Sequence, residues 1–211
     1  KTAGGKGLNV SRVISLAGED VLATGFLGGS NGELIKEKLK EQGLTNQFVG
    51  ISGATRNCIA LLHDNQQTEV LETGPTITNP EQNKFIDQFQ ELVTNCEIIA
   101  ASGSLPAGVP ADFYAQLIEI ANQNNKKFIL DTSGQALEEA LAAKPYLIKP
   151  NQEELENLFN QQLTKQSELI TALEELQKYK IPVIAVSLGA EGLLAIAKDK
   201  IYKIMPPQIK L

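Results

Sequence analysis

The chain has 211 residues, of which 42% are hydrophobic and 21% charged, and this composition excludes disordered, collagen-like and low-complexity classes. A formal net charge of -6 and the lack of any apolar run near the ~20 residues of a membrane span disfavour nucleic acid and membranes as partners. Two cysteines and one histidine allow neither a disulfide framework nor a multi-histidine metal site, so we expect a cytoplasmic protein whose metal, if any, is bound by oxygen.

A glycine loop, Gly4-Gly5-Lys6-Gly7, precedes a predicted helix over residues 8–17. Val10, Val13 and Ile14 are expected on one apolar face of that helix. Glycines let the backbone approach an anion, and a helix N-terminus supplies free N–H groups. The loop is neither a Walker A motif nor a dinucleotide fingerprint. On its own it is therefore a weak indication of an anion site.

Two predicted strands follow, over residues 55–63 and 68–72, with a turn at 64–66. Their short connection favours an antiparallel hairpin. Such a hairpin cannot join a parallel sheet without leaving an unpaired edge. We therefore interpret residues 51–74, approximately, as a small projecting lid inserted into the remainder of the chain.

Arg56 lies in the first of these strands and is one of only two arginines, with Arg12. It is predicted to share a strand face with Cys58, Ala60 and Leu62. A guanidinium projecting from a small apolar surface suits bidentate binding of phosphate or carboxylate. An arginine that keeps a strand edge from aggregating explains the position equally well.

The second half of the chain alternates helical patterns with short apolar runs. Asn79-Pro80 and Gln82 are expected to cap one of these helices. Alternation of this kind predicts an α/β fold, with a doubly wound, mainly parallel sheet and helices on both faces. The four apolar runs are residues 98–101, 127–130, 146–148 and 183–186.

Polar residues follow each of these four predicted strands. In open α/β sheets, ligands bind outside the carboxyl ends of the strands. The common preference of turns for Gly, Ser, Asp and Asn is the alternative explanation for any single one of them. The four segments are Ser102–Pro106, Asp131–Gly134, Lys149–Asn151 and Ser187–Gly192.

Asn151 and Glu154 stand three residues apart at a predicted helix start. Asn151 can cap the helix while Glu154 completes a capping box, and this is the simpler interpretation. Alternatively, the pair can bind a hydrated Mg²⁺ beside a nucleotide phosphate, because magnesium keeps several waters and takes few protein carboxylates. The two roles are compatible.

Three phrases carry a resemblance to a known family: Lys1–Val10, Thr55–Ala60 and Gln67–Glu72. With them, the chain resembles the ribokinase-like sugar kinases of the phosphofructokinase B type over essentially all 211 residues. The resemblance implies a ribokinase-like fold with an antiparallel lid, and ATP and Mg²⁺ as cofactors. It also implies a sugar phosphate as substrate. Independently of the resemblance, the unpaired edges of a projecting two-stranded lid favour a homodimer formed through the lid.

Within that family the phrases are most similar to kinases that phosphorylate the position-1 hydroxyl of tagatose 6-phosphate, followed by kinases of fructose 1-phosphate. A catalytically silent relative that only binds a sugar phosphate or nucleotide is a second possibility. A dinucleotide oxidoreductase on a similar sheet is disfavoured by the failed fingerprint at the glycine loop.

The resemblance also implies roles for individual residues. In it, Gly4, Gly5, Lys6 and Asn9 contact the sugar, Arg56 binds the phosphate that the sugar already carries, and Ser104 contacts the substrate. Lys149 and Asn151 approach the ATP phosphates, Ser187, Gly189 and Gly192 line the nucleotide, and Glu154 holds magnesium through water.

Two family segments have no counterpart in these residues. The family's Gly-Ala-Gly-Asp segment, with the aspartate that serves as general base, is expected after Leu211, and the family's first strand before Lys1. We therefore expect a single incomplete domain that lacks its base and does not turn over by itself.

Overall fold

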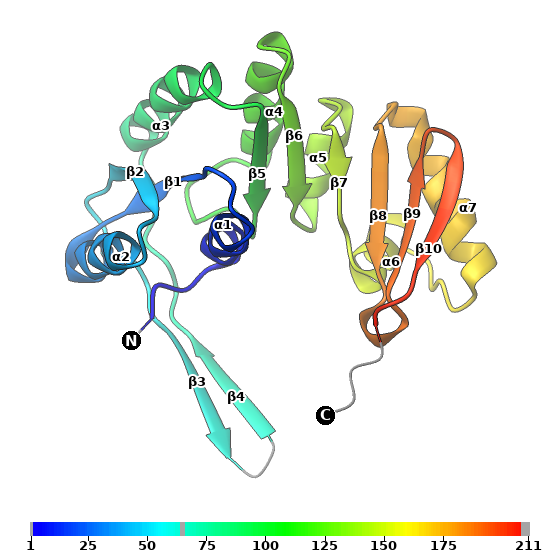
Figure 1. The fold of residues 1–211 in the computed structure, drawn as a ribbon, viewed down its shortest axis with the longest axis horizontal. Coiled ribbons are helices and arrows are strands. Elements are labelled where there is room, and N and C mark those ends of the chain that lie inside the picture. The colour runs from blue at the N-terminus through cyan, green and yellow to red at the C-terminus, as the bar shows by residue number, and fades with distance from the viewer. Residues whose placement is uncertain (1, 64–65, 208–211) are drawn as a thin grey trace. The chain divides into compact units, whose positions relative to one another are not determined.

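The computed structural model describes residues 2–63 and 66–207. Its internal contacts divide the chain into two compact units. The first takes in the chain up to Glu91 together with Leu105–Pro110, and the second takes in Leu92–Ser104 and the chain from Ala111 onward. Figure 1 labels the helices and strands of both, which are described separately below.

The first unit contains a parallel two-stranded sheet of β1 (Leu22–Leu27) and β2 (Thr45–Gly50), joined by helix α2 (Gly29–Glu41). Leu39 of α2 is fully buried. This strand–helix–strand unit was not expected from the sequence. Its strands carry Gly and Thr where the later strands carry continuous apolar runs, which weakens the strand signal.

Helix α1 (Lys6–Leu16) begins two residues earlier than predicted, so Lys6 lies in its first turn. Val10 and Ile14 are half-buried. Val13, however, is 66% exposed, so its predicted place on a buried face is wrong.

Helix α3 (Asn79–Val93) begins one residue before the predicted start. Its capping interaction joins Thr78 to Glu81, because Thr78 N donates to Glu81 Oε2 over 2.8 Å. Gln82, predicted as the capping residue, instead donates its side-chain amide to the carbonyl of Ile77. Among the residues of the helix face, Phe85 and Phe89 are buried and lie 6.2 Å apart, centroid to centroid.

The predicted hairpin is present as a separate two-stranded antiparallel sheet of β3 (Cys58–His63) and β4 (Gln66–Leu71) (Figure 1). Arg56 precedes β3, so its predicted strand face with Cys58 is wrong. The reason is local, because Asn57 N donates to the Glu72 carboxylate over 2.8 Å and the regular ladder starts one residue later. Of the predicted turn, residues 64–65 lie outside the described residues and Gln66 belongs to β4.

The second unit is built on a six-stranded sheet of order β10-β9-β8-β7-β6-β5. The four predicted strands are present and mutually parallel, which confirms the mainly parallel α/β fold. β9 and β10 add an antiparallel edge that the sequence did not predict. The strands are β5 (Ile98–Ser102), β6 (Lys127–Asp131), β7 (Leu147–Ile148), β8 (Val183–Ser187), β9 (Leu193–Ala197) and β10 (Lys200–Ile204).

Helices connect the parallel strands of this sheet, as the alternating pattern predicted. Phe128, Leu130 and Ile184, from β6 and β8, are fully buried. In the described part of the chain, no helix has the length and apolar composition needed to cross a membrane. The helices are α4 (Phe113–Gln123), α5 (Gln135–Ala142), α6 (Gln152–Phe159) and α7 (Gln166–Leu176), with 3-10 turns η1 (Gln177–Tyr179) and η2 (Gly189–Glu191).

Candidate active site

The glycine loop of the first unit leaves the start of α1 open. Gly4, Gly5 and Lys6 are exposed. Gly5 precedes the helix with φ of 120° and forms no side-chain cap, and the first turn holds no acidic residue. Helices otherwise satisfy their first N–H groups with side chains or water. These groups of α1 are therefore available to an anion.

Lys6 and Asn9 lie three positions apart on α1, so their side chains project from neighbouring positions of the helix. Lys6 forms no hydrogen bond or ion pair with another described residue. Asn9 is exposed, and its Oδ1 accepts a hydrogen bond from Arg12 Nη1 over 2.8 Å.

Arg56 is exposed and forms no hydrogen bond or ion pair within the described residues. The residue before it is firmly held. Thr55 N donates to the carbonyl of Gly28, Thr55 Oγ1 accepts from Gly28 N, and Asn31 Nδ2 donates to the carbonyl of Thr55, over 2.8–2.9 Å. A Cβ on Gly28 would lie 2.0 Å from the carbonyl oxygen of Gly53, so this close approach requires glycine. The hairpin base thus presents, from a fixed backbone, a guanidinium that has no partner in the part of the chain that the structure describes.

Glu81 holds the same loop from the other side. Its carboxylate accepts four hydrogen bonds, from the backbone N–H and hydroxyl of Ser52 and of Thr78, over 2.7–3.0 Å. The backbone N–H groups of Ser52 and Thr78 lower the pKa of Glu81 from 4.5 to about 2. Glu81 was not predicted from the sequence, although a Thr followed by Glu three residues later is a capping-box signal.

In the second unit, the carboxyl ends of four parallel strands lie side by side at one end of the sheet. Ser102 at the end of β5 is paired with Asp131 at the end of β6. Lys149, after β7, places Nζ 3.4 Å from Asp131 Oδ1. Asn151 forms a parallel bridge with Ser187 at the end of β8. The structure therefore brings Lys149, Asn151 and Ser187 together with an aspartate that was not assigned a role from the sequence.

Ser104 follows a tightly fixed glycine. Gly103 has φ of 107°, donates its N–H to the carbonyl of Asp131, and accepts hydrogen bonds from Tyr114 Oη and Thr132 Oγ1, all over 2.9 Å. Burial, and secondarily the charge of Asp131, raise the pKa of Tyr114 to about 12, so its hydroxyl is a hydrogen-bond donor throughout the neutral range. Ser104 itself is exposed.

Asn151 and Glu154 form the capping box at the start of α6. Asn151 Oδ1 accepts from Glu154 N over 2.7 Å, and Glu154 Oε2 accepts from Asn151 N over 2.9 Å. The simpler of the two interpretations is thus confirmed. Within the described residues, Asn151 Nδ2 and Glu154 Oε1 have no hydrogen-bond partner. One amide donor and one carboxylate oxygen are therefore available to a ligand.

The segment from Ser187 to Gly192 forms a tight turn between β8 and β9. Leu188 N donates to the carbonyl of Gly192 over 2.8 Å. A Cβ at Gly192 would lie 2.0 Å from the carbonyl oxygen of Ile204, so packing alone requires glycine there. Gly189 has φ of 58° and open space around it.

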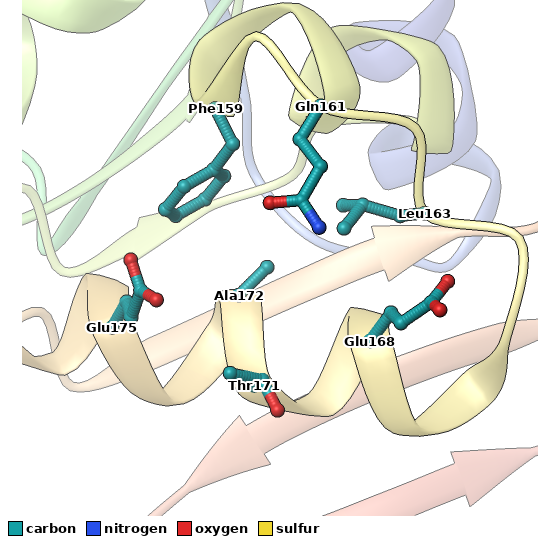
Figure 2. A pocket seen from close by; sticks show the side chains of 7 residues that line it. All are labelled: Phe159, Gln161, Leu163, Glu168, Thr171, Ala172 and Glu175. Carbon is teal, nitrogen blue, oxygen red and sulfur yellow. The ribbon is translucent and has the colours of Figure 1, made fainter.

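A hollow of about 120 Å³ lies elsewhere in the second unit, between the end of α6 and α7 (Figure 2). It contains none of the residues predicted from the sequence, and it is small beside the roughly 300–1,000 Å³ of typical ligand pockets. Its lining residues are Phe159, Gln161, Leu163, Glu168, Thr171, Ala172 and Glu175.

The predicted residues thus fall into two groups, one in each unit. Those of the first unit are Gly4, Gly5, Lys6, Asn9 and Arg56, and those of the second are Ser104, Lys149, Asn151, Glu154, Ser187, Gly189 and Gly192. Within the described residues, no group of three or more His, Cys, Asp or Glu side chains is arranged to hold a metal ion.

An α/β sheet with polar strand ends and a separate antiparallel hairpin is the architecture of a class of carbohydrate kinases. The family described as "pfkB family carbohydrate kinase" matches residues 1–211, and the chain belongs to this family.

Solved structures agree with this assignment. Phosphofructokinase-2 from Escherichia coli in complex with fructose-6-phosphate is 31% identical, with a TM-score of 0.89 over 98% of this chain and 69% of that one. A putative phosphofructokinase from Staphylococcus aureus is 32% identical, with a TM-score of 0.84 over 98% and 67%. A possible 1-phosphofructokinase from Thermotoga maritima is 25% identical, with a TM-score of 0.83 over 94% and 64%.

Proposed function

We propose that this carbohydrate kinase transfers the γ-phosphoryl group of ATP to the position-1 hydroxyl of tagatose 6-phosphate. In this reaction the hydroxyl oxygen forms a bond to the γ-phosphorus, the bond from that phosphorus to the bridging oxygen breaks, and ADP leaves. The single observation that supports a phosphorylated sugar as the acceptor is the state of Arg56 in this pfkB-family chain. Its guanidinium has no hydrogen-bond or ion-pair partner within the described residues and stands on a fixed backbone. Such a fork suits the dianionic phosphate of the sugar.

Tagatose 6-phosphate is favoured by the three sequence phrases, and fructose 6-phosphate is the second candidate. Fructose 6-phosphate is favoured by the likeness to phosphofructokinase-2, whose structure in complex with fructose-6-phosphate is known. The two ketohexose phosphates differ in the orientation of one hydroxyl group. Fructose 1-phosphate is a third candidate, given the likeness to a possible 1-phosphofructokinase.

For the nucleotide, we assign Lys149 and Asn151 to the ATP phosphates, and Ser187, Gly189 and Gly192 to the nucleotide lining. Positioning and charge neutralisation supply most of the catalysis in phosphoryl transfer. Lys149 is 39% exposed and can exchange its contact with Asp131 for a phosphate oxygen. The amide N–H₂ of Asn151 is a second donor at the same carboxyl end of the sheet.

Mg²⁺ fits the donor set at Glu154. Magnesium binds oxygen and is usually held through waters and one or two carboxylates. One oxygen of this carboxylate is occupied by the capping box and the other is available. When bound, the ion neutralises charge on the phosphates. We assign no proton acceptor for the sugar hydroxyl among the described residues.

We further propose that two copies associate through the hairpin. Ile59, Leu61, Val70 and Leu71 are between 48% and 59% exposed there, and Ile59 is paired with Val70 on one face of the hairpin. A strand pair with exposed apolar side chains and unpaired edges favours pairing with another copy. Leu61→Lys should shift the protein toward monomers in analytical ultracentrifugation, and an unchanged sedimentation coefficient would contradict the dimer.

The enzymatic proposal is tested with the product of the complete gene. MgATP-dependent release of ADP is measured with tagatose 6-phosphate, fructose 6-phosphate and fructose 1-phosphate in parallel, and ³¹P NMR identifies the phosphorylated position. We expect turnover with tagatose 6-phosphate to exceed that with the others. Greater turnover with fructose 6-phosphate would move the assignment to the second candidate, and binding of a sugar phosphate without turnover would favour a silent relative.

A further inference from the structure

Arg12 is the only arginine in the sequence besides Arg56, and its guanidinium joins three separate parts of the first unit. Nε donates to Gln42 Oε1 over 2.9 Å, Nη1 donates to Asn9 Oδ1 over 2.8 Å, and Nη2 donates to the carbonyl of Ala3. Gln42 lies at the C-terminal end of α2, and Ala3 is the residue just before the glycine loop. Three hydrogen bonds, one from each guanidinium nitrogen, fix the orientation of a planar fork.

None of these three acceptors is charged. Within the described residues, Arg12 forms no ion pair. Its positive charge is therefore not cancelled locally, and it lies beside a loop whose helix N–H groups are also positive in potential. Both features favour an anionic or oxygen-rich ligand at this loop.

The contact with Asn9 determines which end of that side chain faces outward. An asparagine amide has one acceptor end and one donor end. Because Arg12 binds the Oδ1 of Asn9, the Nδ2 amide is directed away from the guanidinium. Asn9 is exposed, and its Nδ2 has no hydrogen-bond partner among the described residues. The side chain is thus set to donate to an oxygen atom of a ligand.

We propose that Arg12 is a positioning residue that orients the Asn9 amide so that Asn9 donates a hydrogen bond to an oxygen of the sugar phosphate. The contacts with Ala3 and Gln42 hold the guanidinium, and the guanidinium holds the amide. This inference rests on the proposed function, because it takes a sugar phosphate as the ligand. Beyond that function, the inference specifies the direction of the hydrogen bond and adds Arg12, which was not assigned to the site from the sequence.

A double-mutant cycle on steady-state kinetics tests the proposal. The wild-type product of the complete gene and its Arg12→Gln, Asn9→Ala and double variants are compared for the KM of the sugar phosphate at saturating MgATP, and for the KM of ATP at saturating sugar phosphate. Arg12→Gln and Asn9→Ala should each raise the KM of the sugar phosphate about 10-fold, the loss of one well-oriented hydrogen bond. The KM of ATP should not change.

Coupling between the two residues gives the decisive readout. If Arg12 acts through Asn9, then Arg12→Gln adds no further increase in the sugar-phosphate KM once Asn9 is alanine. Arg12→Lys, which retains the charge and can reach one acceptor, should recover part of the affinity. Lys36→Gln is the matched control for loss of a positive charge, because Lys36 pairs with Glu33 on the surface of α2, and it should leave both KM values unchanged.

Other outcomes would overturn the inference. Additive penalties in the double variant would show that Arg12 does not act through Asn9, and equal increases in both KM values would show that Arg12 acts only on general structure. If the wild-type protein turned over no sugar phosphate while remaining folded, the proposed function would fail and the inference with it. Turnover by the wild type with no effect of Arg12→Gln would remove the inference alone.

Discussion

The basic residues predicted to bind ligands differ in state between the two units. In the first unit, Lys6 and Arg56 have no hydrogen-bond or ion-pair partner among the described residues, and the start of α1 has no side-chain cap. In the second unit, Lys149 is paired with Asp131, and the start of α6 is closed by the Asn151–Glu154 capping box.

This difference shows that residue type alone does not define an anion site. An unpaired cation on a fixed backbone can bind a phosphate without giving up an existing contact. A paired cation must exchange one contact for another, so part of the gain on binding is lost. We therefore expect single substitutions in the first unit to affect ligand affinity more than those in the second.

The largest effect is expected at Arg56. Arg56→Ala should raise the KM of the sugar phosphate about 100-fold, because a charge-assisted contact contributes roughly 1.5–3 kcal/mol. The KM of ATP should stay as in the wild type. Steady-state kinetics measures both, with Arg56→Lys as a control that keeps the charge but not the bidentate fork. A rise in the KM of ATP to the same extent would refute the assignment of Arg56 to the sugar phosphate.

A smaller effect is expected at Lys149. Lys149→Met should raise the KM of ATP about 10-fold, since the lysine gives up its contact with Asp131 when it binds phosphate. Asp131→Asn provides the counterpart, because it releases Lys149 from its partner and removes a negative charge near the phosphates. The KM of ATP should then fall. If Asp131→Asn raised it instead, the ion pair would be part of the binding arrangement rather than its competitor.

At Asn151, structural and ligand-binding roles can be separated. Asn151→Ala should destabilise the protein by about 1 kcal/mol through loss of the helix cap, which corresponds to a Tm lower by roughly 2–4 °C for a chain of this size. Asn151→Ser keeps a capping oxygen but loses the amide donor. It should retain the wild-type Tm and raise the KM of ATP. If the KM of ATP were unaltered in the serine variant, capping the helix would be the only role of Asn151.

At Glu81 the smallest effect on substrate affinity is expected, and the change appears instead in the pH dependence of stability. A carboxyl whose pKa falls from 4.5 to about 2 on folding contributes stability that is complete above pH 4.5 and is lost as the pH falls toward 2. Glu81→Gln should lower the Tm at neutral pH, and the difference from wild type should diminish over that acidic range. Thermal melts at several pH values measure this. A difference that is constant with pH would exclude the charge of Glu81 as the cause.

Much of the fold could be predicted because its signals are local. The strands β5 to β8 are continuous apolar runs, and their alternation with helices identifies a parallel sheet. The pair β1 and β2 was missed because glycine and threonine interrupt it, and β10 because two lysines break up its short apolar pattern. Arg56 was placed in a strand because the pattern could not show that Glu72 binds Asn57 N and ends the ladder there.

The candidate site was predictable to the extent that residues share an element or a strand end. Lys6 and Asn9 follow from one helix, and Lys149, Asn151 and Ser187 follow from adjacent strand ends. The tertiary partners of the site residues and of the residues that hold them could not be predicted from the sequence. These partners come from distant parts of the chain, 18 to 30 residues away. The pairs are Asp131 with Lys149, Glu81 with Ser52, and Gln42 with Arg12.

The most direct test of this account compares Arg56→Ala and Lys149→Met for both substrates in one set of measurements. Our account predicts a crossed pattern, in which Arg56→Ala raises only the KM of the sugar phosphate and Lys149→Met raises only the KM of ATP. If each variant raised both KM values equally, or if neither changed the KM of its assigned substrate, the division of the two substrates between the two groups of residues would be wrong.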